Sequence, residues 1–208
     1  MAYVLGFFMA DGYVFSSKRG ANYFAIQIKD EDLLINIRSA LGSENKITKR
    51  VHLKNKSVFY RLQIGSNEIC EDLAKLGIKE RKTYRLKLPV GIPKKYFGDF
   101  VRGYFDGDGN VWTGLVHKDR KSSKMTLQIG FTSCSELFLK GLQESLRSYG
   151  LGEGSFFTQK NYFRLKYSLK DSLILSKIMY NNNVNGLFLE RKKNRFEKFF
   201  KNKDGPVV

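Results

Sequence analysis

The sequence predicts an α+β protein built from two pseudo-symmetric halves, each with the element order α-β-β-α-β-β-α. Three observations support this fold: a nine-residue motif occurs twice, similar segments follow each copy in the same order, and the same succession of helix and strand patterns follows both. Each half is expected to hold one antiparallel sheet, and the halves are expected to join where the two motif helices pack. The first repeat is placed at residues 1–87, a linker at 88–95 and the second repeat at 96–208.

The repeated motif stands near the start and near the middle of the chain. Its copies, Val4–Gly12 and Val101–Gly109, share a glycine, two aromatic residues, a small residue, an aspartate and a glycine in register, 97 positions apart. Two further pairs of segments match in the same order: Ile37–Gly42 with Leu146–Gly152, and Glu80–Leu86 with Glu190–Phe196. Chance could explain one such pair, but hardly an ordered set of three.

The first half begins with the motif helix, which is expected to end at Asp11-Gly12 because glycine gives the backbone the freedom that a helix end needs. Alternating or helical spacing of apolar residues then marks the elements that follow. They are, in order, the strands Tyr13–Ser17 and Tyr23–Lys29, the helix Glu31–Leu41, the strands Lys46–Lys54 and Val58–Gly65, and the helix Asn67–Leu76.

The second half repeats this order after its own motif helix, which is expected to end at Asp108-Gly109. The predicted elements are the strands Asn110–His117 and Met125–Thr132, the helix Glu136–Tyr149, the strands Ser155–Lys160 and Tyr162–Leu169, and the helices Asp171–Tyr180 and Leu187–Phe200. Between the halves, Leu88–Pro93 is rich in proline and is therefore interpreted as the linker.

Composition excludes several classes of protein. Hydrophobic residues make up 42% of the chain, which supports a packed core and argues against disorder. The longest apolar run, Ala2–Ala10, is far shorter than the roughly 20 residues of a membrane span. Cys70 and Cys134 are too few for a disulfide framework, and with His52 and His117 they do not make a zinc site. A reducing compartment is the natural inference.

Net charge points to the partner. Lys and Arg number 37 and Asp and Glu 20, which gives a formal charge of +17. The cations are spread along the chain and interleaved with aromatic and β-branched residues, so they do not form a tail. A strongly basic globular chain is typical of nucleic-acid binding. The alternatives at this point are a solvated basic surface or a basic segment that binds membrane lipid.

Each predicted strand has an apolar face and a polar face, because alternate residues point to opposite sides. In Lys46–Lys54, for example, Ile47, Val51 and Leu53 form the apolar face. The polar faces carry side chains that bond phosphates and base edges, so each sheet is expected to face DNA rather than water alone. The expected DNA contacts are Lys18, Arg19, Gln27, Lys29, Lys46, Thr48, Arg50, His52, Lys54, Arg61, Gln63, Lys124, Thr126, Gln128, Thr158, Lys160, Arg164 and Lys166.

The two nonapeptides resemble the LAGLIDADG motif, and the whole chain is similar to LAGLIDADG homing endonucleases of the single-chain form with two motifs. Small residues four positions apart, Gly6 with Ala10 and Gly103 with Gly107, allow the two motif helices to pack closely. The packed pair would then present two carboxylates side by side, from Asp11 and Asp108 at the helix ends.

Two adjacent carboxylates repel each other unless a cation lies between them, and hard oxygen ligands suit Mg²⁺. The resemblance implies that Asp11 and Asp108 are catalytic metal ligands, one for each DNA strand, and that the backbone carbonyls of Ala10 and Gly107 help to hold the metal. The first motif departs from the second at Met9, which stands where the second copy has Asp106. In the family that position does not bind metal, so the departure leaves the predicted activity intact.

Lys82 and Lys192 stand at matching places after the fourth strand of each half. The resemblance implies a basic catalytic residue near there, close to the scissile phosphate, where it would stabilise charge on a phosphoryl oxygen. An ordinary phosphate contact is the alternative, and the neighbours Arg81 and Arg191 are equally placed candidates.

These observations predict a divalent-metal-dependent endonuclease that makes a staggered double-strand break in a long asymmetric DNA target, acting as a monomer without a membrane or protein partner. The expected cofactor is Mg²⁺ or another divalent cation. The resemblance implies a mobile-element role, in an intron-encoded or free-standing form, inside a cell; an organelle such as the mitochondrion is one candidate location. Two alternatives stay open: an RNA-binding intron maturase and a non-catalytic regulator on the same fold.

Overall fold

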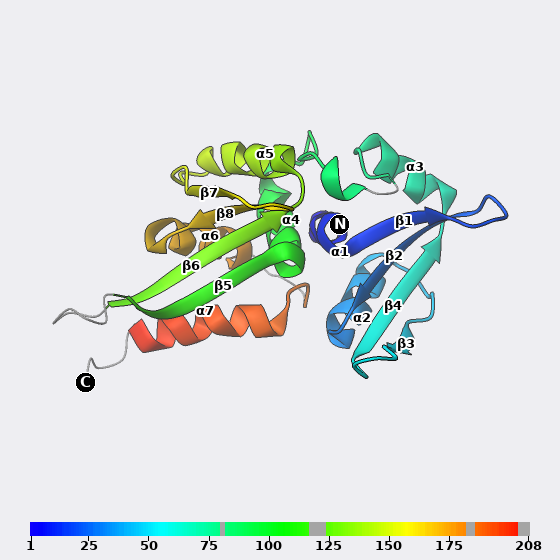
Figure 1. The fold of residues 1–208 in the computed structure, drawn as a ribbon, viewed down its shortest axis with the longest axis horizontal. Helices are drawn as coiled ribbons and strands as arrows, with labels where there is room; N and C mark the ends of the chain where they lie inside the picture. Colours follow the sequence, from blue (N-terminus) through cyan, green and yellow to red (C-terminus); the bar gives the residue numbers. More distant parts are fainter. Residues whose placement is uncertain (80–81, 117–123, 182–185, 204–208) are drawn as a thin grey trace.

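The computed structural model describes residues 1–79, 82–116, 124–181 and 186–203. It contains two halves of similar build that meet at a central pair of helices (Figure 1). The elements of the first half are α1 (Ala2–Asp11), β1 (Gly12–Ser16), β2 (Asn22–Ile28), α2 (Glu31–Ala40), β3 (Thr48–Val51), β4 (Val58–Gly65), α3 (Asn67–Lys75) and the short 3₁₀ helix η1 (Lys82–Tyr84).

The second half follows the same order and adds a helix at its end. Its elements are α4 (Lys94–Asp108), β5 (Gly109–Val116), β6 (Lys124–Ser133), α5 (Glu136–Arg147), β7 (Ser155–Thr158), β8 (Phe163–Tyr167), α6 (Leu169–Tyr180) and α7 (Glu190–Lys203). The last helix, α7, lies along the edge strand β5 (Figure 1). The predicted linker, residues 88–95, comprises an irregular segment and the first two residues of α4.

Each half contains one four-stranded antiparallel sheet, with strand order β1-β2-β4-β3 in the first and β5-β6-β8-β7 in the second. The two registers give residue equivalences between the halves. Gly12 pairs with Ile26, and its motif counterpart Gly109 pairs with Phe131. Ile26 and Phe131 are therefore equivalent, as are their partners on the next strand, Leu62 and Leu165. The predicted α+β fold of two matching halves is confirmed.

The helices α1 and α4 pack along the centre of the molecule with their backbones in contact. A Cβ atom added at Gly6 would collide with the carbonyl oxygen of Phe100, and one added at Gly103 would collide with the carbonyl oxygen of Tyr3. A Cβ atom added at Gly107 would likewise collide with the Cβ atom of Ala10. The prediction that these small residues permit a close crossing is confirmed.

Each half also extends a segment onto the other. In the segment before α7, the carbonyl of Gly186 accepts a hydrogen bond from the Asn36 side chain on α2, at 2.9 Å. In the segment after η1, the carbonyl of Leu86 accepts a hydrogen bond from the Ser135 hydroxyl at the start of α5, at 2.6 Å. Leu86 is the last residue of the matched sequence Glu80–Leu86, and Gly186 lies four residues before its counterpart Glu190–Phe196, so a segment near the end of each repeat contacts the other half.

The strand predicted at Lys46–Lys54 is the clearest error of the sequence analysis. The observed strand β3 covers only Thr48–Val51, and all four of its residues are exposed. Val51 and Leu53, assigned to an apolar face, are 53% and 87% exposed. The chain turns back directly after His52, whose carbonyl accepts a hydrogen bond from the Lys56 backbone N–H at 2.9 Å, so the strand does not extend to Lys54. An edge strand this short does not need a buried face.

Candidate active site

The two motif aspartates end the central helices. Asp11 is the last residue of α1 and Asp108 the last of α4, and a strand begins directly after each because the following glycine adopts an extended backbone. Both aspartates are exposed. A Cβ atom added at Gly107 would lie 3.3 Å from Asp11 Oδ2, so the end of α1 touches the end of α4. The structure therefore brings the two predicted metal-binding residues to one place.

The pKa values of two buried residues, Tyr104 and Lys192, also indicate that Asp11 and Asp108 lie close together. Both Asp11 and Asp108 contribute to raising the pKa of Tyr104, behind the larger effect of burial. Both also act on Lys192, whose pKa burial lowers to about 8 while the nearby carboxylates oppose that shift. The two carboxylates thus act on the same two buried groups. Their pairing is a property of the helix crossing and not of either half alone.

Lys192 closes the C-terminal end of α4. Its Nζ donates to the carbonyls of Phe105 at 2.6 Å, Asp106 at 2.8 Å, Gly107 at 3.3 Å and Gly109 at 2.6 Å. The last carbonyls of a helix have no partner within the helix, and a cation also favours the negative end of its dipole. In this structure Lys192 therefore stabilises the backbone that carries Asp108. Lys82 begins η1, but its side chain and Arg81 lie outside the described residues.

Asp106, unlike Asp11 and Asp108, is buried, and the sequence analysis assigned it no role. Its Oδ2 accepts hydrogen bonds from the Tyr3 hydroxyl at 2.8 Å and from the backbone N–H of Leu189 at 2.9 Å. Its other oxygen, Oδ1, is buried without a hydrogen-bond partner. Burial raises the pKa of Asp106 to about 6, although these hydrogen bonds and the charges of Lys192 and Arg102 act in the opposite direction.

Arg102, one turn before Asp106, was also missed. It is 2% exposed, and its guanidinium donates to the carbonyls of Leu187 at 2.9 Å and Met179 at 2.6 Å. It also forms an ion pair with Asp99 at 2.8 Å. A signal was present in the sequence, because Arg102 and Asp106 are four residues apart in a helix that is otherwise apolar along its buried length. Such a pair on a core-facing helix indicates buried backbone groups that need partners.

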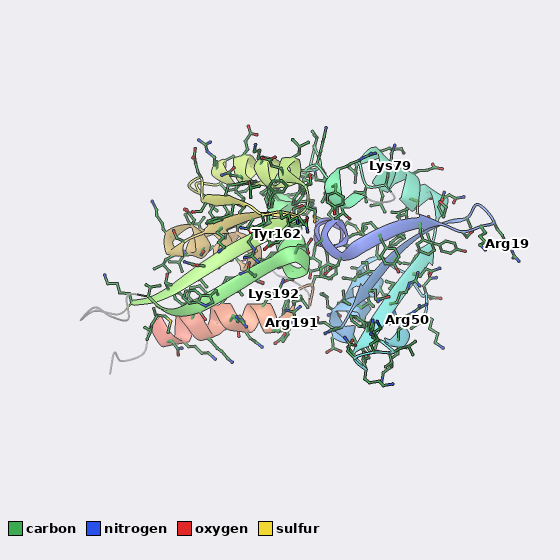
Figure 2. The ribbon with its side chains drawn as sticks, viewed as in Figure 1. Arg19, Arg50, Lys79, Tyr162, Arg191 and Lys192 are labelled. Carbon is green, nitrogen blue, oxygen red and sulfur yellow. The ribbon has the colours of Figure 1, made fainter. Side chains whose placement is uncertain are left out.

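An open pocket of about 490 Å³ adjoins Asp11. Its lining combines residues of the first half with the start of α7 from the second: Phe7, Asp11, Gln27, Ile28, Lys29, Asp30, Leu189 and Arg191. Two of the predicted DNA contacts, Gln27 and Lys29, thus share a pocket with a predicted metal ligand. Figure 2 shows Arg191 and Lys192 at the first turn of α7, at the junction of the two halves.

The predicted contacts of the first sheet fall into two groups. On the strands, Arg61 of β4 lies over the rings of Tyr13 and Phe15, at 5.6 and 5.5 Å from their centroids; Lys29, directly after the end of β2, lies over Phe59 at 5.5 Å. These aromatic partners were not predicted; they hold long basic side chains in place through cation–π contacts. The other predicted DNA contacts that lie on β2, β3 and β4 are Gln27, Thr48, Arg50 and Gln63. Lys18, Arg19, Lys46, His52 and Lys54 lie outside the strands, and Figure 2 shows Arg19 at the tip of the β1–β2 turn.

The second sheet collects three of its predicted contacts around one pocket of about 310 Å³, lined by Gln128, Arg164 and Lys166 with Asn110, Trp112, Ile129 and Gly130. Arg164 lies over Tyr162 and Lys166 over Phe157. Arg164 is the register equivalent of Arg61, and the Nε atom of each is buried without a hydrogen-bond partner.

The other predicted contacts of the second sheet are less uniform. Lys124 begins β6, Thr158 ends β7 and Lys160 lies in the β7–β8 turn; all three are exposed. Thr126 is only 9% exposed. The Trp112 ring lies over Gly114, which is the strand partner of Thr126, so an aromatic side chain covers this part of the outward face. DNA contact by these residues stays a prediction.

The candidate metal site offers a small set of hard oxygen donors. Within the described residues there is no group of three or more His, Cys, Asp or Glu side chains that could hold a metal. Two carboxylates with adjacent backbone carbonyls fit Mg²⁺, which proteins often bind through one or two carboxylates while substrate phosphates and water complete the shell. No helix in the described part of the chain is long and apolar enough to cross a membrane.

Comparison with known proteins finds a family model that matches the first part of the chain and solved structures that share its fold. Residues 1–81 match the family model of the LAGLIDADG-like domain. Two proteins of Methanocaldococcus jannaschii are similar in part. A replication factor C small subunit is 28% identical over 111 residues, which are 51% of this chain and 6% of that protein. The uncharacterized protein MJ0398 is 24% identical over 119 residues, which are 56% of this chain and 41% of that protein. The match thus spans less than half the length of either relative.

Solved structures match the whole chain. The LAGLIDADG meganuclease I-AabMI bound to uncleaved DNA has a TM-score of 0.63 at 15% identity, covering 97% of this chain and 89% of its own. The homing endonuclease I-LtrWI bound to target DNA has a TM-score of 0.63 at 14% identity, covering 98% and 89%. I-SmaMI bound to uncleaved DNA in the presence of calcium ions has a TM-score of 0.62 at 17% identity, covering 96% and 89%. At these identities the likeness concerns the fold.

Proposed function

We propose that this chain is a LAGLIDADG protein with both motifs in one polypeptide and that it acts as a site-specific, divalent-metal-dependent DNA endonuclease. One observation carries the proposal: the α1–α4 crossing brings the carboxylates of Asp11 and Asp108 together at the helix ends that lead into the two basic sheets. The structural neighbours that were solved with DNA support double-stranded DNA as the partner. We further propose that one chain is sufficient, because it contains both halves of the site.

The roles follow from the positions of the side chains. Asp11 and Asp108 would hold divalent cations, with the carbonyls of Ala10 and Gly107 as further ligands, and each aspartate would serve one DNA strand. The cations would supply the positive charge that an in-line phosphodiester displacement needs at its attacking and leaving oxygens. Lys192 keeps the end of α4 in place, because it binds four of the carbonyls around Asp108. The choice of Mg²⁺ is supported by the donor set alone, and a relative solved with calcium ions supports divalent cations in general.

The two sheets would bind the DNA duplex, one on each side of the cleavage site. Their outward side chains are the basic and amide groups that bond phosphates and base edges in the major groove, which a β-ribbon can enter. The two carboxylates lie between the sheets, so each would meet a different strand and the break would be staggered. A long target follows from two four-stranded surfaces laid along one duplex. An intron-encoded or free-standing mobile element is the genetic setting that we propose for such an enzyme.

The test begins with in vitro selection of cleaved sequences from a DNA library in Mg²⁺. On the selected target, Asp11→Asn and Asp108→Asn should each abolish double-strand cleavage while gel-shift affinity changes little, because each carboxylate is expected to bind the cation rather than a phosphate or a base edge. Asp72→Asn, which removes an exposed acid of α3, is the matched control and should cut as the wild type does. Full cutting by either motif variant would refute the assignment of the site.

The same experiment separates the alternatives. A wild-type chain that binds the DNA library tightly but leaves every sequence uncut would support a non-catalytic regulator. Tighter binding to structured RNA than to DNA, measured on the same preparation at the same salt concentration, would support an intron maturase. Retention of both motif acids favours the endonuclease over both alternatives, since neither binding role needs a pair of metal-binding carboxylates.

A further inference from the structure

Three aromatic side chains form a row on the first sheet. Tyr13 and Phe15 lie on β1, and Tyr23 of β2 pairs with Phe15. The ring centroids of Tyr13 and Phe15 are 5.8 Å apart, and those of Phe15 and Tyr23 are 5.3 Å apart, with their planes 15° from parallel. A Cβ atom added at Gly65 on β4 would lie 3.0 Å from the Tyr23 ring, so the row extends toward a third strand. We call Tyr13, Phe15 and Tyr23 the aromatic row.

The register places the aromatic row on the face that is expected to meet DNA. Tyr13 pairs with Ala25, and Ala25 pairs with Gln63, so these three residues share one side of the sheet. The core lies on the other side, where Phe24 and Ile26 are buried. Tyr13 is 38% exposed, and the other two members of the row are partly exposed. A duplex that lies against this sheet would therefore meet apolar rings as well as polar side chains.

The rings are held in place before any DNA binds. The guanidinium of Arg61 lies over both Tyr13 and Phe15. Because β2 lies between β4 and β1, the Arg61 side chain crosses β2 to reach these rings. Ala25 of β2 is fully buried although it is on the outward face, which fits a side chain that passes over it. Contact with a rigid ring costs little side-chain entropy, so even one small apolar group of the DNA would add to the affinity.

The apolar partner that the major groove offers to such rings is the 5-methyl group of thymine. The other groups on the base edges there are hydrogen-bond donors and acceptors, which a ring face does not satisfy. Tyr13 and Phe15 are two residues apart on a strand, about 6.8 Å, which equals two base-pair steps of about 3.4 Å. Tyr13 follows Asp11 by two residues and Phe15 by four, so Tyr13 would lie nearer to the cleavage site.

The second sheet has different chemistry at the equivalent positions. By register, the counterparts of the aromatic row are Asn110, Trp112 and Gln128. Asn110 and Gln128 are exposed, and amide side chains of this kind bond adenine at N6 and N7 rather than a methyl group. The Trp112 ring lies over Gly114 of its own strand. At these matched positions, contiguous apolar rings are therefore a property of the first sheet.

We propose that the aromatic row recognises thymine methyl groups in the half-site bound by the first sheet. One A·T base pair faces Tyr13, and a second, two steps farther from the cut, faces Phe15 and Tyr23. This inference rests on the proposed binding of double-stranded DNA and names the bases and the atom that these side chains contact. It differs from a purely supporting role, in which the rings only position Arg61 and the methyl groups would not affect binding.

Substitution of uracil for thymine tests the proposal with the wild-type chain. Uracil lacks the 5-methyl group and retains the hydrogen-bonding groups of thymine. A target is selected from a DNA library by binding in EDTA, and each of its thymines is then replaced in turn by deoxyuridine. At two positions, two steps apart in one half-site, the affinity should fall about fourfold, the value of one buried methyl group. At the same base pairs, 7-deazaadenine should change the affinity less than twofold, because the rings do not contact N7. Thymines in the flanking DNA are the control.

Variants of Tyr13 assign the contact to a side chain. Tyr13→Ala should bind thymine and uracil equally at the position nearer to the cut and still distinguish them at the farther one. Tyr13→Phe should distinguish them at both, since only the hydroxyl is lost. Leu137→Ala, which removes an exposed apolar side chain of α5, is the matched control and should behave as the wild type does.

Two results would overturn the proposal. One is equal affinity of the wild type for thymine and uracil at every position, and the other is a Tyr13→Ala variant that distinguishes them as the wild type does. Binding in EDTA involves no cleavage. A chain that bound the selected target but cut no DNA in Mg²⁺ would therefore refute the endonuclease function alone, and the uracil comparison would still decide the methyl contact.

Discussion

The helices α1 and α4 carry the same motif and cross at matching glycines, but only α4 buries charged side chains. Arg102 and Asp106 of α4 stand where α1 has Leu5 and Met9, 97 positions earlier. Both charged residues are 2% exposed or less, as is Met9. The two helices therefore pack against each other in the same way, but the residues that they bury against the rest of the molecule differ.

The difference follows from what lies behind each helix. Behind α4, the end of α6 and the segment before α7 bring unpaired backbone groups into the core, and Arg102 and Asp106 bond to them at Met179, Leu187 and Leu189. On the corresponding side of α1, Phe8 packs edge to face against Phe24 of the first sheet, with the ring centroids 5.7 Å apart. Buried backbone groups need partners, whereas apolar side chains need only a fitting surface. The difference at these two positions thus follows from the backbone groups that α6 and the segment before α7 bring against α4.

The largest expected effect lies where the two helices are alike. Gly6→Leu and Gly103→Leu should both prevent folding, because even the first side-chain carbon would strike a backbone carbonyl of the other helix. Thermal unfolding followed by circular dichroism should show no cooperative transition for either variant. Gly141→Ala on α5 is the control, since its added carbon would meet only the Leu88 side chain, at 3.1 Å from Cβ and 3.9 Å from Cδ2. A folded Gly6→Leu beside an unfolded Gly103→Leu would mean that the crossing is not symmetric.

The next effect tests the buried arginine. Arg102→Leu introduces the residue that α1 has at this place and leaves Asp99 and two buried carbonyls without their partner. The free energy of unfolding in urea should fall by about 2–6 kcal/mol, because each of the two buried carbonyls left without a donor costs about 1–3 kcal/mol. At the matching position of α1, Leu5→Met should cost less than about 1.5 kcal/mol, because it conserves volume and no polar group depends on Leu5. Similar losses in both variants would contradict the proposed difference between the helices.

Asp106 gives a pH-dependent version of the same test. Its pKa of about 6 in the folded protein exceeds the ordinary value of 3.8 because of burial, so the folded state binds the proton more tightly than the unfolded state. The resulting stabilisation is fully present below pH 3.8 and is lost as the pH rises through 6, by up to about 3 kcal/mol. Asp106→Asn does not titrate, so its stability relative to the wild type should increase between pH 4 and pH 7. Urea unfolding of both proteins at the two pH values measures this, and parallel pH profiles would contradict it.

The parts of the fold that could be predicted from sequence are those set by local pattern. Motif repetition gave the pair of halves, and alternation gave the strand β4 with the bounds that the structure has, Val58–Gly65. The length of β3 could not be predicted, because the turn at His52 depends on backbone hydrogen bonds rather than on side-chain alternation. The aspartates could be paired in advance, since the spacing of small residues implies the helix crossing.

The contacts around the site could not be predicted from the sequence, because they depend on how distant elements pack. Lys192 was predicted near the active site from its place in a repeat, but its four carbonyl partners depend on how α7 lies against α4. The same holds for Arg191, which crosses to the other half. Long-range contacts of this kind involve residues about 80 to 160 positions apart, and periodicity within one element carries no information about them.

The smallest expected effect is a change in base preference, which depends on how the outward side chains of the two sheets differ. Gln63 on β4 pairs with Ala25, and Lys166 on β8 pairs with Gly130, so the register makes Gln63 and Lys166 equivalent. Gln favours adenine and Lys favours guanine in the major groove, so the two half-sites should differ at this base pair and the target should be asymmetric. Gln63→Lys should shift the preference from adenine toward guanine in one half-site only, by about 1–3 kcal/mol, or roughly 10- to 100-fold in relative cleavage.

The measurement is repeated selection of cleaved sequences with the wild type, Gln63→Lys and the reciprocal Lys166→Gln, together with cleavage of two artificial palindromes that each duplicate one half-site. Each variant should cut the palindrome of its unaltered sheet as the wild type does. Because each sheet differs from the other in its outward side chains, the wild type should cut neither palindrome as well as the asymmetric target. Equal cutting of both palindromes, or a preference that changes in both half-sites after a single substitution, would show that the two repeats do not read the DNA separately.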